Sequence, residues 1–177
     1  MRRAIVAVAM AASGLAAGAM AFEPVTAQLE QRLREQGVEA VNDHLALPTN
    51  AFDLALLHRD TEGCVARAVG LTLALSRGGR SKTTEAHTDS LRTALGRCPR
   101  LVLSLVSPAE VPKVCASVAS WTVMQTVREL RRRMRTIEAD EALRTSANGK
   151  ACSAACLHEL KTTRAGLQAS PRGGRRP

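Results

Sequence analysis

Apolar residues recur every three or four positions along most of this chain, which is the spacing of one face of an α-helix. The pattern predicts a first helix over residues 26–45, weakened at Gly37, and a second helix over residues 51–76. The second segment has the clearer apolar stripe and is predicted to be buried. A glycine-rich turn, RGGRSK (77–82), then precedes a third helix over residues 84–98, with Thr84 as its capping residue.

The segment RLVLSLV (100–106) is ambiguous, because a short apolar run suits either a buried helix or a strand. After it, Ser107 and Glu110 have the spacing of a capping box, which predicts the start of a long helix. Apolar residues then recur as far as Ile137, a stretch of roughly 40 Å at 1.5 Å per residue. This stripe contains Val111, Val114, Val118, Trp121, Met124, Val127, Leu130, Met134 and Ile137. After a break at TSANGK (145–150), the pattern predicts a last helix over residues 150–167.

Composition supports this helical prediction. The chain has no Tyr, one Trp and two Phe, so its core must consist of Leu, Val, Ala and Met. Such a core, with few aromatic and β-branched alternations, favours helices over a sheet. We therefore predict an all-α fold, a disulfide-stapled bundle of about four to five helices that follows a cleaved signal peptide.

The first residues indicate export. Arg2 and Arg3 precede a run of small apolar residues over 4–20, and Ala19-Met20-Ala21 fits a signal-peptidase site, with Phe22 as the mature start. The alternative is a membrane anchor, but the run is short and rich in Ala and Gly. No later stretch is apolar enough to cross a bilayer, so the cleaved product is not expected to be an integral membrane protein.

This interpretation divides the chain into three parts. They are a signal peptide (1–21), a single helical domain (22–168) and a disordered basic tail (169–177). The predicted location of the mature chain is periplasmic or secreted.

Positive charge is concentrated in the last third of the chain. The formal net charge is +9, yet residues 22–120 carry eleven basic and eleven acidic residues. Residues 121–177 carry twelve basic residues against five acidic ones. The excess therefore belongs to the run ELRRRMR (129–135), its surroundings and the tail.

The arginine run is the feature that suggests a partner. Helical spacing places Arg128, Arg132 and Arg135 on one face of the predicted helix. Arg131 and Arg133 lie beside this face, and Arg133 is positioned to pair with Glu129 at i,i+4. The candidate binding residues are Arg128, Arg131, Arg132 and Arg135. Guanidinium groups bind phosphates and carboxylates well, although such a run also occurs as a plain solvated face. Nucleic acid is not expected as the ligand, because of the location and because aromatic residues for base stacking are few.

Five cysteines follow the signal peptide, which predicts two disulfides and one free thiol in an oxidising compartment. Helices that fold back across the glycine turn would bring Cys64 opposite Cys98. Such a bridge should contribute about 3 to 4 kcal/mol. Cys115 would then pair with Cys152 or with Cys156, if the last helix crosses back. We predict the pair Cys115–Cys152 and a free Cys156.

The stretch KACSAACLHELK (150–161) raises the alternative of a metal or redox site. On a helix, Cys152 and Cys156 face the core with the leucines, whereas His158 is turned about 200° away from Cys156. The segment has too few ligands for a structural zinc and lacks the Cys-x-x-Cys motif. EAHTD (85–89) also offers three possible ligands, but we interpret it as the acidic first turn of a helix whose stripe includes His87. No metal site and no cofactor are predicted.

Common catalytic motifs are absent from the sequence, and the protein is not expected to be an enzyme. An enzyme whose site is assembled from distant helices is the weakest hypothesis. The first hypothesis is a small exported binding protein that acts on another envelope or secreted protein, as inhibitors, immunity proteins and accessory proteins of secretion or transfer machines do. The alternative is an electrostatic binder of anionic lipid headgroups or glycans.

Overall fold

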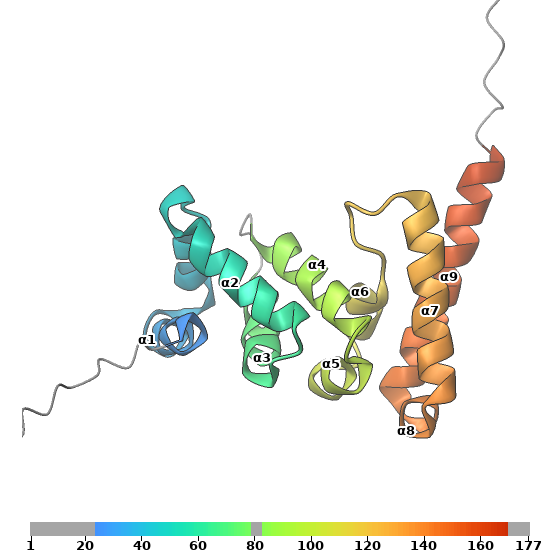
Figure 1. The fold of residues 1–177 in the computed structure, drawn as a ribbon, viewed down its shortest axis with the longest axis horizontal. Helices are drawn as coiled ribbons and strands as arrows, with labels where there is room; N and C mark the ends of the chain where they lie inside the picture. The colour runs from blue at the N-terminus through green and yellow to red at the C-terminus, as the bar shows by residue number, and fades with distance from the viewer. Residues whose placement is uncertain (1–23, 79–82, 170–177) are drawn as a thin grey trace, which may run out of the picture.

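All regular secondary structure in the residues that the structure describes is helical, which confirms the predicted all-α fold. The computed structural model describes residues 24–78 and 83–169 (Figure 1). Its elements are α1 (Val25–Leu45), the 3-10 helix η1 (Pro48–Asn50), α2 (Ala51–Glu62), α3 (Ala66–Leu75), α4 (Thr84–Leu95), α5 (Pro99–Leu105), α6 (Val111–Cys115), α7 (Val123–Ala139), α8 (Glu141–Thr145) and α9 (Ala147–Ala169). No helix within these ranges is both long enough and apolar enough to span a membrane.

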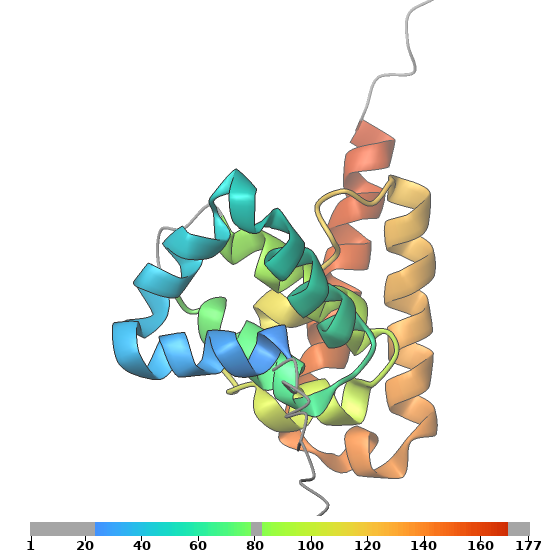
Figure 2. The same cartoon turned by 60° about the vertical axis from the view of Figure 1, so that its left-hand side comes forward.

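The helices follow one another along the longest axis of the molecule, from α1 at one end to α7 and α9 at the other (Figure 1). α2 and α3 pack against α1, and α4 packs against α2, α3 and α6. α6 also packs against α9. At the far end, α7 and α9 run side by side in opposite directions, and the short helix α8 joins their lower ends (Figures 1 and 2).

Two apolar clusters hold these helices together, and α3 contributes to both. The first cluster consists of Leu29, Val41, Leu45, Leu57, Ala68, Leu71 and Leu75. The second and larger cluster extends to the far end and includes Val69, Leu73, Leu91, Leu95, Val102, Val114, Leu130, Ile137, Cys152, Cys156 and Leu160. α3 is apolar on opposite faces because it lies between the two clusters, as expected for a helix that is buried all round.

The predicted helix over residues 51–76 is wrong in its continuity, because α2 and α3 are separate helices. Gly63 ends α2, with its N–H donating to the carbonyl oxygen of Arg59 at 2.8 Å. Cys64 then adopts a left-handed conformation with φ of 66°, and Val65 is extended. A left-handed residue cannot continue an α-helix, so the apolar stripe passes through a turn.

The predicted long helix ending at Ile137 is also wrong, because residues 116–122 form a non-helical linker between α6 and α7. α7 has its own start: the Thr122 side chain accepts from the Gln125 N–H at 3.3 Å, and the Gln125 side chain accepts from the Thr122 N–H at 2.8 Å. This capping box satisfies backbone donors that a continuous helix would have used internally. The spacing Thr-x-x-Gln therefore marked a helix start inside the apolar stripe.

The earlier capping box, predicted at Ser107, forms only in part. Glu110 reaches back and accepts from the backbone N–H and the hydroxyl of Ser107, at 2.8 and 2.6 Å. The helix itself begins only at Val111. Ser107 therefore stabilises the turn that precedes α6.

Other features of the prediction agree more closely with the observed helices. α1 contains a kink at Gly37, which has φ of 84°, and the ambiguous segment 100–106 is helical in α5. α8 was missed, although Asp140 caps it by accepting from the Leu143 N–H at 3.3 Å. With two broken helices plus α5 and α8, the described residues form nine α-helices in place of the expected four to five.

Some predictions fall on residues that the structure does not describe. These are the signal peptide (1–21), most of the turn at 77–82, and the basic tail from residue 170 onward. Residue 169, predicted to begin the tail, is the last residue of α9.

Candidate binding surfaces around helix α7

The four arginines predicted to bind a partner are exposed on α7, but they lie on two different surfaces. Arg128 and Arg132 line a hollow between α7 and the end of α4. Arg131 and Arg135 line a groove between α7 and α9. A helix turns by about 100° per residue, so the consecutive arginines of the run cannot all face one neighbour.

The hollow beside α4, here called the arginine pocket, has a volume of about 290 Å³. Its lining includes Arg97, Trp121, Gln125, Arg128, Glu129, Arg132 and Arg133. Arg132 is held in place because its guanidinium pairs with the Glu129 carboxylate at 2.6 Å and donates to the Gly96 carbonyl oxygen, also at 2.6 Å. Gly96 permits this approach, since a Cβ atom there would lie 2.4 Å from Arg132 Nη2.

Glu129 is the only carboxylate among the residues lining the arginine pocket, and it pairs with Arg132 rather than with Arg133 as predicted. Arg128 comes no closer than 3.9 Å to it. Arg97 donates to the backbone carbonyl oxygen of Glu62 at 3.0 Å. The rim of the pocket therefore carries more positive charge than its single carboxylate neutralises.

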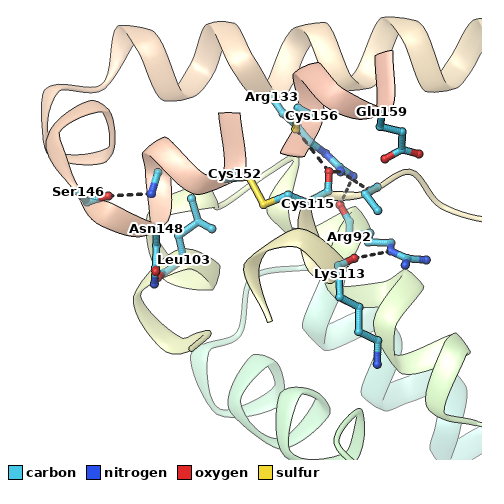
Figure 3. Close-up of a disulfide and its surroundings, with 12 residues drawn as sticks. Arg92, Leu103, Lys113, Cys115, Arg133, Ser146, Asn148, Cys152, Cys156 and Glu159 are labelled. Atoms are coloured by element: carbon cyan, nitrogen blue, oxygen red, sulfur yellow. Dashed lines mark hydrogen bonds between the residues drawn. A yellow bond between two sulfur atoms is a disulfide. The ribbon is translucent and has the colours of Figure 1, made fainter. Parts of the chain in front are cut away.

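Arg133 is the buried member of the run, with 3% of its surface exposed. Its guanidinium donates to the carbonyl oxygens of Cys115, Ala116 and Arg92 (Figure 3). It also lies 5.0 Å from the ring centroid of Trp121. Burial lowers the pKa of Arg133 to about 10, so the side chain remains charged at neutral pH. Arg133 therefore fixes the 116–122 linker against α4 and α7, and it is not an exposed ligand.

The second surface, here called the α7–α9 groove, has a volume of about 380 Å³. It is lined by Arg131, Met134, Arg135, Glu138, Leu157, Leu160 and Lys161. Leu160 is 6% exposed and Met134 is partly buried, so apolar side chains from both helices form its floor, and Leu157 in the same lining is 42% exposed. The groove therefore combines an apolar floor with a mainly cationic border.

The structure places four cysteines in the two predicted disulfides. Cys64 and Cys98 have Cα atoms 6.1 Å apart, and Cys115 and Cys152 have Cα atoms 5.4 Å apart. The second pair forms because α9 packs against α6, which is the crossing that the sequence required (Figure 3). Cys156 is the free cysteine; it is fully buried, and its thiol donates to the Cys115 carbonyl oxygen at 3.4 Å.

Polar side chains also hold α9 in register with its neighbours. The Glu159 carboxylate accepts from the Ser117 N–H at 2.8 Å and from the Ser117 hydroxyl. Asn148 donates to the carbonyl oxygens of Leu103 and Val106, at 2.9 and 3.0 Å. These bonds connect the start of α9 to the end of α5 and the middle of α9 to the 116–122 linker, so they hold α9 in place beside α7.

His87 lies in α4 between two neighbouring helices and is fully buried. Its Nδ1 atom is 2.9 Å from His58 Nε2, and its Nε2 atom is 3.0 Å from Asn42 Oδ1. Asn42 donates through Nδ2 to the Leu75 carbonyl oxygen, so its Oδ1 atom accepts. His87 must then donate from Nε2 and accept at Nδ1. Burial and the nearby His58 lower its pKa to about 3, and the neutral ring serves to connect α1, α2 and α4.

The neighbours of His87 in EAHTD are also engaged in structure. Glu85 and Asp89 accept from Arg92 Nη1 at 2.6 and 2.7 Å. Across residues 24–78 and 83–169, no group of three or more His, Cys, Asp or Glu side chains is placed to hold a metal ion.

Sequence reasoning missed several residues of both surfaces. Arg97 lies in the turn after α4 and Lys161 lies in α9, and only the folded arrangement brings them close to α7. Trp121 was assigned to the core stripe, whereas it is half-buried beside Arg133.

Comparison with protein family models, with curated proteins and with solved structures finds no match.

Proposed function

We propose that this chain is an exported helical protein that binds another protein through the basic surface of α7, without turnover of a substrate. The observation that carries the proposal is the set of exposed arginines on α7. Arg131 and Arg135 form no ion pair within the described residues, and Arg128 has only a distant carboxylate. A partner with an acidic surface would supply the missing carboxylates, because the guanidinium fork matches a carboxylate in a bidentate pair.

Export is supported by the two disulfides, since such bonds persist in oxidising compartments and are rare in the cytosol. Binding by a rigid surface is supported by the same bonds, because a preformed surface loses little conformational entropy on association. Arginine and tryptophan are also enriched at the centres of protein interfaces. Inhibitors, immunity proteins and accessory proteins of secretion or transfer machines are the functional types that this combination fits.

The second candidate function is electrostatic binding of anionic lipid headgroups or glycans. It is favoured by the arginine pocket, where several guanidinium groups share one carboxylate. The two functions differ in salt dependence, because contacts with exposed anionic groups are screened within about 10 Å at 0.1 M salt. A shape-matched protein complex depends less on salt.

The test compares two triple variants that lose the same charge. R128Q/R131Q/R135Q changes the proposed surface, whereas R34Q/R59Q/R144Q changes exposed arginines elsewhere. Arg132 is left in place because it holds Gly96. Crosslinking and mass spectrometry in an envelope extract should identify one stoichiometric partner for the native chain and for the control, with at least about tenfold weaker binding by the first variant.

The proposal fails if both triple variants lose the partner equally, because that would show a response to net charge alone. Binding to anionic vesicles or glycans that disappears at high salt, and disappears in R128Q/R131Q/R135Q only, would favour the second candidate function.

A further inference from the structure

The α7–α9 groove is an apolar channel whose border is charged. Met134 comes from α7, and Leu157 and Leu160 come from α9. Leu160 is nearly buried, whereas Leu157 is 42% exposed and lies open to a partner. An apolar floor of this kind, rimmed by polar groups, is typical of a binding groove.

We propose that this groove binds an acidic amphipathic helix of the partner protein, laid between α7 and α9 as a third helix. The inference rests on the proposed function and specifies the chemistry of the partner. The two sides of the groove are helical stripes, Arg131 to Glu138 on α7 and Leu157 to Lys161 on α9. The α7 stripe is roughly 10 Å long, which accommodates about two turns of a helix.

The charged residues at the border of the groove determine which side chains the bound helix must carry beside its apolar face. Arg131 and Arg135 stand on the α7 side, and Lys161 stands on the α9 side. None of the three forms an ion pair within the described residues, and Glu138 is the only acidic residue in the lining. A helix with apolar residues at i, i+3, i+4 and i+7 and with Asp or Glu beside them would fill the floor and pair with both sides.

Other occupants fit the charges less well. A second copy of the chain would place Arg131, Arg135 and Lys161 opposite the same three cations, and like charges in contact disfavour association. The C-terminal residues 170–177 include Arg172, Arg175 and Arg176, so they meet the same repulsion. A lipid surface requires apolar side chains that project beyond the charged ones, whereas this floor lies between two helices.

A synthetic helical peptide provides the probe. It carries leucines at i, i+3, i+4 and i+7 with flanking glutamates, and its control peptides have flanking lysines or scrambled leucines. Fluorescence anisotropy with the oxidised full chain should show binding of the glutamate peptide that is at least about tenfold stronger than binding of either control.

Matched variants locate the site. Leu157→Lys should weaken binding of the glutamate peptide by about tenfold or more. Phe52→Lys should leave it unchanged, because Phe52 is 71% exposed in α2, which lies toward the end of the molecule opposite α7 and α9 (Figure 1). R131E/R135E should reverse the preference and favour the lysine peptide. Each variant is compared by its melting temperature, so that a folding defect is recognised.

Several results would overturn the inference. They are equal binding of all peptides, equal loss in Phe52→Lys and Leu157→Lys, and vesicles of anionic lipid that bind through Leu157 while the peptide does not. If the natural partner of the chain is lost in R128Q/R131Q/R135Q but retained in Leu157→Lys, the groove inference fails while the proposed function stands. If both variants retain the partner, both the groove inference and the proposed function are contradicted.

Discussion

His87 is neutral in the folded protein because it is enclosed between His58 and Asn42. Protonation of its Nδ1 atom would replace an acceptor by a donor facing His58 Nε2, which is itself a donor. The ring therefore has a preferred charge state and a preferred tautomer, both set by its hydrogen bonds.

Acid should destabilise the protein through this residue. The pKa of His87 is lowered from 6.5 to about 3, so the unfolded chain binds a proton in this interval and the folded chain does not. The free energy of unfolding therefore decreases as the pH falls below 6.5, because the unfolded chain gains a proton there that the folded chain does not bind. This decrease continues until the pH approaches 3. Between pH 7 and pH 5 the free energy of unfolding should fall by about 2 kcal/mol from this group. Urea denaturation at the two pH values measures it.

The matched variants for this prediction are His87→Gln and His158→Gln. Glutamine at position 87 can both donate and accept but does not titrate, so the pH dependence should be smaller. His158 is exposed on α9 and takes no part in the contacts of His87 with His58 and Asn42, so His158→Gln removes a histidine and leaves those contacts in place. An unchanged acid response in His87→Gln would contradict the prediction.

At the scale of single residues, burial of Cys152, Cys156 and His87 could be predicted because each follows the apolar stripe of its helix. The role of Arg133 could not. Its position next to exposed arginines suggested solvent, and only the 116–122 linker supplies the carbonyl oxygens that it binds. Those acceptors come from a loop that the sequence pattern had assigned to a helix.

At the scale of elements, both broken helices were missed because apolar periodicity alone does not show where a helix ends. Apolar periodicity continues through Gly63 and through residues 116–122, so it does not report the breaks. The local indications were the glycine after α2 and the spacing of Thr122 and Gln125. Such capping interactions decide a boundary because each one satisfies backbone groups at a helix end.

Two helical glycines provide a test of how closely elements approach. Gly149 in α9 faces α8, where a Cβ atom would lie 1.9 Å from the Leu143 carbonyl oxygen. Backbone atoms cannot move away as a side chain can, so Gly149→Ala should lower the free energy of unfolding by about 1–3 kcal/mol. Chemical denaturation measures the change.

Gly70 in α3 is the control, because nothing lies within 4 Å of a Cβ atom there. Gly70→Ala should raise the free energy of unfolding by about 0.5–1 kcal/mol through helix propensity. Equal stability of the two variants would show that α8 and α9 are not in close contact.

At the scale of the molecule, the two disulfides differ in their access to solvent. Cys64 and Cys98 are partly exposed, whereas Cys115 and Cys152 are fully buried in the larger cluster. The all-α architecture and the Cys64–Cys98 pair required only helix patterns and cysteine positions, which left Cys152 and Cys156 as alternative partners of Cys115. The arrangement of α7 beside α9, which creates the groove, depends on how segments distant in sequence pack together. It could not be predicted from helix patterns and cysteine positions.

Limited reduction of the folded protein should open Cys64–Cys98 first. Each bridge should contribute about 4 kcal/mol by the chain-entropy model, with loops of similar length. The Cys156 thiol should stay unmodified until the chain unfolds, because burial excludes the reagent and raises its pKa to about 11. Alkylation followed by mass spectrometry gives the order, and early labelling of Cys156 or Cys115 would contradict it.

The two covalent loops, 64–98 and 115–152, follow one another along the chain and do not overlap. When the oxidised chain is pulled from its ends, each disulfide prevents the segment inside its loop from extending. Each segment would otherwise add roughly 110–120 Å of extended length, at about 3.4 Å per residue. A narrow pore that admits one extended strand would therefore pass the thiol form and stall at the first bridge of the oxidised form. Transport through such a pore has to precede oxidation of the cysteines.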